Sequence, residues 1–105
     1  MQRNVLLSLH GNSILIDQSS LDVLIGDTVA FISSDGNQYD IVIPNKDNFF
    51  VNNDNGATIE GMADQNIDLI TNAVNNKPVG TTKYYSVTTP GGGVPLAPPR
   101  IIVIE

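Results

Sequence analysis

Hydrophobic and polar residues alternate in short runs along most of the chain. Residues 5–9 place a hydrophobic side chain at every second position, and residues 21–25 repeat this pattern. A period of two puts the hydrophobic side chains on one face of a β-strand. The runs are rich in β-branched and aromatic residues, and Asn, Asp, Gly and Ser separate them. This arrangement is typical of an all-β domain.

Turn residues mark where the predicted strands end. Gly26-Asp27 and Asp35-Gly36 are the clearest signals, because Gly tolerates a positive φ and Asp can accept hydrogen bonds from its own backbone. Pro44 ends the return strand that follows the second of these turns. The pattern therefore predicts strands over 5–9, 14–16, 21–25, 29–31, 39–43, 83–88 and 100–105, with one further short strand at 49–51.

The segment 63–75 departs from this alternation. Ile67, Ile70 and Val74 fall near helical spacing, Asp64 could cap a helix start, and Pro78 would prevent its continuation. The spacing predicts a short helix within 63–75.

The end of the chain combines a loop with an unusually apolar run. Residues 89–99 hold three consecutive glycines followed by prolines, which predicts a loop that stiffens toward polyproline II. Residues 100–105 have hydrophobic side chains on both faces, which favours a central or covered strand. Because this run has no polar interior residue, it is also the natural candidate for edge pairing with other chains.

Length and composition indicate one domain over residues 1–105. A chain of this size buries enough surface for a single core, and its 41% hydrophobic content is ordinary. It has no Cys, which excludes disulfides, zinc fingers, iron–sulfur clusters and thiol nucleophiles.

A net charge of −6 with scattered Lys and Arg argues against nucleic acid as a partner. No run approaches the length of a membrane span. Residues 1–10 begin like a signal peptide, but Ser8 and His10 interrupt them, and a first strand is predicted instead.

Two segments resemble the cupredoxin family. Residues 21–31 are similar to the family's alternating strand followed by Gly-Asp-Thr-Val-x-Phe, and residues 84–105 resemble its strand, ligand loop and final strand. The resemblance implies an all-β, Greek-key β-sandwich and an extracytoplasmic location. An immunoglobulin-like sandwich is the alternative fold, because it has the same alternation.

The residues that such a domain uses to hold copper are absent at the matching positions. Tyr39 stands where a His ligand opens the strand, Val87 where Cys would be, and Pro90 near the second His position. The loop to Pro99 contains no Met. The resemblance therefore implies the fold alone, because proteins that share a fold can differ in function. Without the copper ligands we expect no copper and no electron transfer, and no other cofactor is predicted.

Other motifs are better explained as turns. His10 beside Gly-Asn is a turn residue, and Asn52–Gly56 lacks two of the ligands that a calcium loop requires. Pro95, Pro98 and Arg100 fit a P-x-x-P-x-Arg ligand of SH3 domains, but a rigid lead-in to the last strand is the better explanation. An Asp-based metal-dependent enzyme would need three carboxylates to face one cleft, out of Asp35, Asp40, Asp47, Asp54, Asp64 and Asp68.

The sequence favours a non-catalytic module that binds an unidentified protein partner, as a monomer or a weak homo-oligomer. An exposed loop at the end of a sandwich is the best place for contacts, although buried tyrosines would be equally natural in the core. The alternative is a structural domain that assembles through edge strands. The candidate contact residues are Tyr39, Tyr84, Tyr85, Gly91, Gly92, Gly93, Val94, Pro95 and Leu96.

Overall fold

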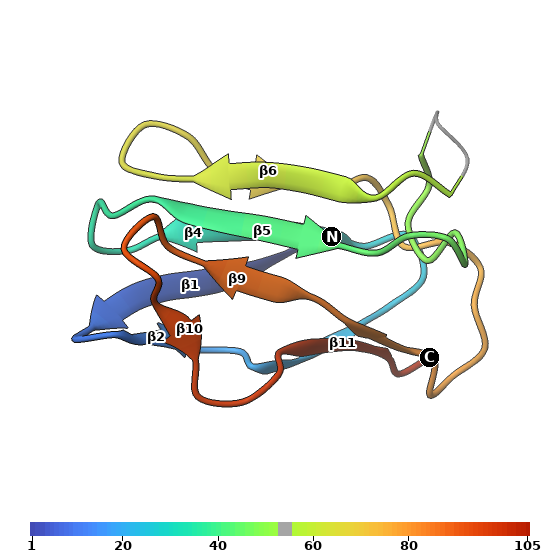
Figure 1. Cartoon of the computed structure of the whole chain (residues 1–105). Coiled ribbons are helices and arrows are strands. Elements are labelled where there is room, and N and C mark those ends of the chain that lie inside the picture. The colour runs from blue at the N-terminus through green and yellow to red at the C-terminus, as the bar shows by residue number, and fades with distance from the viewer. Residues whose placement is uncertain (53–55) are drawn as a thin grey trace.

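The computed structural model describes residues 1–52 and 56–105, and these are strands joined by turns and loops (Figure 1). No helix that could span a membrane occurs among them. The strands are β1 Gln2–His10, β2 Ser13–Ile16, β3 Ser20–Val23, β4 Thr28–Ser33, β5 Tyr39–Ile43, β6 Ile59–Ala63, β7 Leu69–Ile70, β8 Thr82–Tyr84, β9 Ser86–Thr88, β10 Val94–Pro95 and β11 Arg100–Val103.

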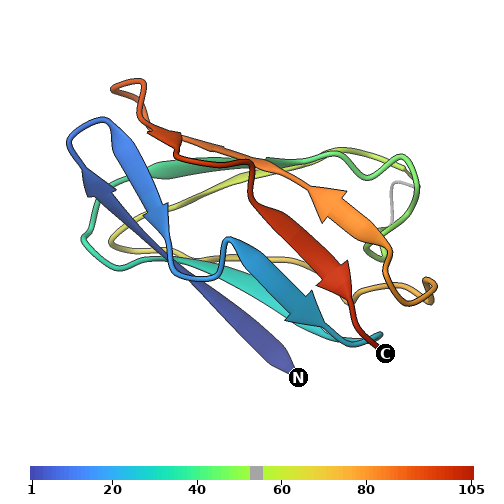
Figure 2. The same cartoon turned by 90° about the horizontal axis from the view of Figure 1, so that it is seen from below.

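The strands form the two layers of a β-sandwich, which Figure 2 shows from below. One layer is a five-stranded sheet in the order β10-β2-β1-β4-β7, in which β1 runs antiparallel to β2 and parallel to β4. The other layer contains the sheets β3-β11-β8 and β6-β5-β9. Only Tyr85 separates β8 from β9, so one run of chain belongs to both of these sheets. The predicted all-β sandwich is confirmed.

The chain changes layers between β2 and β3. β2 pairs with β1, whereas β3 pairs in parallel with β11. Asp17 ends the first pairing, because its carboxylate accepts the Leu6 N–H at 2.8 Å and its own N–H donates to the Leu6 carbonyl at 3.2 Å. The continuous segment from β2 to β3 thereby connects the two layers along one side of the sandwich.

Alternate residues of the strands fill the core between the layers. The rings of Phe31 and Tyr85 meet edge-on, with centroids 5.1 Å apart, an arrangement that aromatic pairs prefer. The largest fully buried side chains are those of Tyr39, Phe31, Phe49, Phe50, Leu7, Ile14, Ile41, Ile43, Ile101, Val5, Val23 and Val29.

The Gly-Asp motif before β4 forms a tight turn with a buried carboxylate. Gly26 adopts a φ of 89°, which favours glycine. The Asp27 carboxylate accepts hydrogen bonds from the Leu24 N–H and from Arg3 Nε, both at 2.8 Å, and from the Met1 amino group at 2.9 Å. These contacts tie the start of β1 to the start of β4.

The loop after β5 is held by a buried amide. Asn45 is fully buried, its Nδ2 donates to the Phe50 carbonyl at 3.0 Å, and its Oδ1 accepts the Phe50 N–H at 2.9 Å. The side chain thus satisfies both backbone groups of one residue, as a neighbouring strand would. The strand predicted at 49–51 is reduced to a single antiparallel bridge between Phe50 and Val74.

The helix predicted within 63–75 is wrong. Asp64 Oδ1 does accept the N–H groups of Asn66 and Ile67, but it caps a turn that leads into β7. β7 pairs with β4, which directs Leu69 toward the core and leaves Ile70 half-exposed. Pairing with a neighbouring strand therefore outweighed a weak helical pattern.

The last strand lies in the middle of its sheet, as its apolar pattern predicted. β11 pairs with β3 on one side and with β8 on the other. Its hydrogen-bonding groups are therefore occupied on both edges. The prediction that this strand would pair with other chains is wrong.

Candidate functional site

The positions matched to copper ligands lie at the end of the sandwich where β5 begins and β9 ends. Ile41 of β5 stands opposite Val87 of β9, so Tyr39 and Val87 are diagonal neighbours on the inner face. Pro90 follows two residues after β9. The fold therefore places these positions around one end of the core.

Tyr39 is tied to the hairpin that precedes it. Its hydroxyl lies 2.9 Å from both carboxylate oxygens of Asp35, to which it donates. Asp35 also accepts the N–H groups of Leu9 at 2.8 Å and Asn37 at 3.1 Å. The carboxylate thus holds together three parts of this end of the sandwich.

Both groups of this pair have shifted pKa values. Burial, and then the bond to Asp35, raises the pKa of Tyr39 to about 12. Burial opposes ionisation of Asp35, but the hydrogen bonds from Leu9, Asn37 and Tyr39 together outweigh it and lower the pKa to about 2. At neutral pH the phenol therefore stays protonated and the carboxylate ionised, which preserves the bond.

The side chains at this end do not fit copper. Val87 is almost fully buried and Pro90 is exposed, and neither offers a donor atom. The phenol of Tyr39 is already engaged with Asp35, and the only imidazole is the exposed His10 at the end of β1. Redox-active copper sites use a thiolate and imidazoles. Within residues 1–52 and 56–105, no group of three His, Cys, Asp or Glu could hold a metal ion.

The glycine-rich turn is fixed by hydrogen bonds. The Gly92 N–H donates to the Thr89 carbonyl at 2.9 Å, and the Gly93 N–H donates to Thr89 Oγ1 at 2.8 Å. Gly92 has a φ of 86°. A Cβ on Gly93 would lie 2.8 Å from Thr89 Oγ1 and 3.0 Å from Leu9 Cδ1. The close approach of Thr89 and Leu9 favours glycine at position 93. The two hydrogen bonds to Thr89 stabilise the turn.

The structure divides the predicted contact residues into buried and accessible ones. Tyr39 and Tyr85 are core residues, and Gly93 is buried as well. Tyr84 is 54% exposed, but it stands on β8 opposite Arg100, on a different part of the surface from the loop. The accessible residues of the loop are Gly91, Gly92, Val94 and Leu96, with Pro95 partly exposed.

Residues 94–97, here called the strap, run along the open side of the sandwich between β2 and β9. Val94 pairs with Ser13 and Pro95 with Ile14, so the strap begins as an added strand. Leu96 is 78% exposed. The chain bends at Leu96 and Ala97, which interrupts the continuous polyproline II helix that an SH3 ligand would need. A lead-in to β11 describes this segment better.

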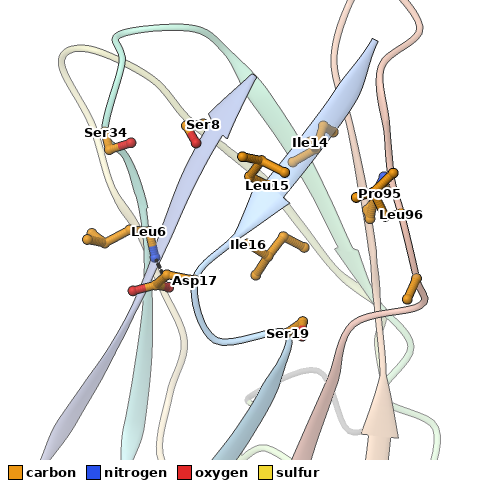
Figure 3. Close-up of a pocket in the computed structure, with 11 residues that line it drawn as sticks. Leu6, Ser8, Ile14, Leu15, Ile16, Asp17, Ser19, Ser34, Pro95 and Leu96 are labelled. Atoms are coloured by element: carbon orange, nitrogen blue, oxygen red, sulfur yellow. Dashed lines mark hydrogen bonds between the residues drawn. The ribbon is translucent and has the colours of Figure 1, made fainter. Parts of the chain in front are cut away.

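A hollow of about 590 Å³ lies beside the strap (Figure 3). Leu6 and Ser8 of β1 and Leu15 of β2 form one wall, and Pro95 and Leu96 form the other. A second hollow of about 310 Å³ lies against β9, lined by residues 85–88 and 94–99. The strap contributes to both hollows.

Sequence reasoning missed the two leucines of this hollow, Leu6 and Leu15. They are 41% and 38% exposed. The signal was present, because both sit in continuous apolar runs, 5–7 and 14–16, where alternation would place a polar residue. An apolar residue at an outward strand position points to a covered or contacted face.

Tyr85 contributes an unusual buried group close to the strap. Among the described residues its hydroxyl is buried without a hydrogen-bond partner. Burial raises the pKa of this phenol, and the negative charge of Asp17 raises it further. The group is therefore neutral at physiological pH.

The carboxylates required for an Asp-based enzyme do not converge. Asp35 is bound to Tyr39, Asp47 forms an ion pair with Lys83 at 2.9 Å, and Asp64 caps its own turn. Asp54 and most of the loop compared with a calcium site lie outside the described residues. These three carboxylates serve turns and loops.

Comparisons with known proteins show which fold this is. No family model matches the sequence, and no curated protein matches it. Among solved structures, auracyanin B aligns over 99% of this chain and 88% of its own, with 16% identity and a TM-score of 0.59. A reduced amicyanin variant aligns over 95% and 81%, with 16% identity and a TM-score of 0.55. A reduced Cu(I) form of another amicyanin variant gives 14% and 0.57 over the same shares.

These likenesses establish the class of the protein at the level of its fold. The chain is a cupredoxin-like β-sandwich, and this part of the sequence prediction is confirmed. At sequence identities of 14–16% these comparisons support a shared fold, and they do not support copper binding by this chain. What the domain does must be argued from its own side chains.

Proposed function

We propose that the chain is a copper-free module with a cupredoxin-like fold that binds a protein partner and performs no catalysis. The observation that supports this most is the identity of the side chains at the positions matched to copper ligands. Tyr39 is bound to Asp35, and Val87 is packed in the core. This end of the sandwich serves stability, and the binding role belongs elsewhere on the surface.

The strap is the proposed contact site. Val94 and Leu96 are 55% and 78% exposed, and the strap separates two hollows. The bonds from Gly92 and Gly93 to Thr89 hold the start of the strap in place. A loop fixed before binding loses little conformational entropy when a partner docks.

The charge of the chain limits the kind of partner. At a net charge of −6 the protein repels nucleic acids and other polyanions. Among the described residues that line the hollow beside the strap, Asp17 alone has an ionisable side chain, and its carboxylate accepts the Leu6 N–H. The partner surface is therefore apolar and lacks acidic groups. The proposed location is extracytoplasmic, which the resemblance alone supports.

The binding role predicts that two substitutions in the strap remove partner capture. Immobilised chain carrying Val94→Ser and Leu96→Ser should retain at least tenfold less partner from an extract of the source cells than the unmodified chain. The cause is the loss of two exposed apolar side chains, which supply contact energy when buried. Quantitative mass spectrometry of the captured proteins measures the change.

Met62→Ser is the matched control, because Met62 is 42% exposed on β6 in the other layer. This variant should capture the same proteins as the unmodified chain. Equal capture by all three baits would refute the strap as the contact site.

A further inference from the structure

The edge of β9 that faces the strap is bonded to the following chain at two points. The Tyr85 N–H donates to the Pro99 carbonyl at 3.2 Å, and the Thr89 N–H donates to the Gly93 carbonyl at 3.3 Å. Between these two points lie residues 94–98, and within the part of the chain that the structure describes they make no hydrogen bond to β9. The second hollow, of about 310 Å³, occupies this interval.

The main chain of Val87 points toward this interval. Successive residues of a strand direct their N–H and C=O groups to opposite edges. Tyr85 and Thr89 bond on the edge that faces the strap, so Val87, midway between them, presents both of its groups on that same edge. The residues on either side of it, Ser86 and Thr88, are those that bond to β5.

The two groups of Val87 are buried without a partner, which is uncommon in a folded protein. Val87 is 1% exposed, and no hydrogen bond from another described residue reaches its N–H or C=O. The chain opposite cannot supply the missing bonds as a regular strand would, because Pro95, Pro98 and Pro99 have no N–H. Tyr85 lines the same hollow, and its buried hydroxyl also lacks a partner among the described residues.

We propose that an extended segment of the partner protein pairs with Val87 on this edge of β9. This inference rests on the proposed binding role and names the part of the partner that docks. The N–H and C=O of one strand residue match the C=O and N–H of one residue of an antiparallel neighbour. An extended main chain therefore satisfies both groups at once, and adding a strand to an unpaired edge is a recurring mode of peptide recognition.

The middle of the strap moves aside when the segment enters. Leu96, Ala97 and Pro98 are exposed, and they form no hydrogen bonds with other described residues. The bonds that anchor this stretch lie on either side of it, at Val94 and Pro99. Displacement of the middle therefore breaks no hydrogen bond of the described structure.

The surroundings of Val87 define the side chains of the segment. Residues that stand opposite one another in a strand pair point to the same face. The residue opposite Val87 therefore points toward the core, where an apolar side chain is favoured. The hollow is at the lower end of the roughly 300–1,000 Å³ of ligand pockets, so this side chain is small. Proline is excluded at this position, because the residue must donate its N–H.

Amide hydrogen exchange of the full chain, measured by NMR at each residue, tests the starting point. The Val87 N–H should exchange at least about tenfold faster than those of Ser86 and Thr88, because these two are bonded to β5 and Val87 is not. Equal protection of all three would mean that Val87 is already bonded, for example through a water molecule, and would overturn the proposal.

Binding is tested with random peptides of about seven residues, slightly longer than a typical strand, displayed on phage and selected on the full chain. A selected peptide should slow exchange of the Val87 N–H at least about tenfold and leave those of Ser86 and Thr88 unchanged. N-methylation of the peptide amide that pairs with Val87 should weaken binding at least about tenfold. The matched control is N-methylation of the next residue, whose N–H points to the opposite edge, and its effect should stay within about twofold.

Other results separate this proposal from the binding role. Peptides that leave the Val87 N–H unprotected, or whose N-methylated forms all bind alike, refute strand addition. If their binding is lost in the chain carrying Val94→Ser and Leu96→Ser, the strap remains a contact site. Failure to select any peptide also refutes strand addition. In that case, loss of partner capture by the same double variant leaves the binding role standing, and unchanged capture refutes both.

Discussion

Replacing Asn45 with Ala is expected to lower the free energy of unfolding by roughly 2–4 kcal/mol. The Asn45 amide bonds both the N–H and the carbonyl of Phe50, and the site is fully buried. Alanine can replace neither bond, so two backbone groups would lose their partners away from water. Urea denaturation at neutral pH, followed by circular dichroism, measures the change.

Asn76→Ala is the control for this measurement. Asn76 is exposed, and its side chain lies outside the core, so its replacement should change the free energy of unfolding by less than about 0.5 kcal/mol. If the two variants differ by less than about 1 kcal/mol, Asn45 does not hold the loop in the way described.

Asp27→Asn should cost about 2 kcal/mol at neutral pH, and this cost should shrink in acid. Burial opposes ionisation of Asp27, but hydrogen bonds from the Met1 amino group, the Leu24 N–H and Arg3, with the charge of Arg3, outweigh it. Together they lower the pKa from 3.8 to about 2. A lowered pKa in the folded state means that the ionised carboxylate stabilises the fold. That contribution is complete above about pH 3.8 and is lost as the pH falls toward 2.

The test is urea denaturation of the unmodified chain and Asp27→Asn at several pH values between 2 and 7. The difference between the two proteins should be constant near neutrality and decrease below about pH 4. Asp22→Asn is the control, because Asp22 is exposed on β3. A difference for Asp27→Asn that is independent of pH would show that the charge of the carboxylate contributes nothing.

The strands were predictable because each strand of a sandwich buries every second side chain. Hydrophobic residues therefore recur at every second position of the sequence. β5 spans Tyr39–Ile43 as predicted, because the Asp35-Gly36 turn and Pro44 mark its two ends. The turn at Gly26-Asp27 was likewise visible.

The errors arose where distant parts of the chain decide the local structure. Ile67 and Ile70, which suggested a helix, are each more than half exposed, and pairing with β4 determines the conformation of this segment. The role of Asn45 depends on a loop that returns to meet it. No local pattern reports such a contact.

The candidate site was predictable in part. The absence of copper ligands followed from residue identities. Val94 and Leu96 are exposed, as expected for contact residues, but the structure places them along the open side of the sandwich, where Val94 pairs with Ser13 of β2. The contributions of Leu6 and Leu15 depend on which strands are neighbours. The structure supplies that register, and the sequence alone did not.

Copper loading tests the central claim most directly. The purified chain is incubated with excess copper under oxidising and reducing conditions, desalted, and subjected to elemental analysis and visible spectroscopy. With Tyr39 bound to Asp35, Val87 in the core and one exposed imidazole, we expect less than about 0.1 copper per chain and no copper–thiolate absorption. One tightly held copper per chain, lost in His10→Ala, would contradict the account and restore a metal function to this fold.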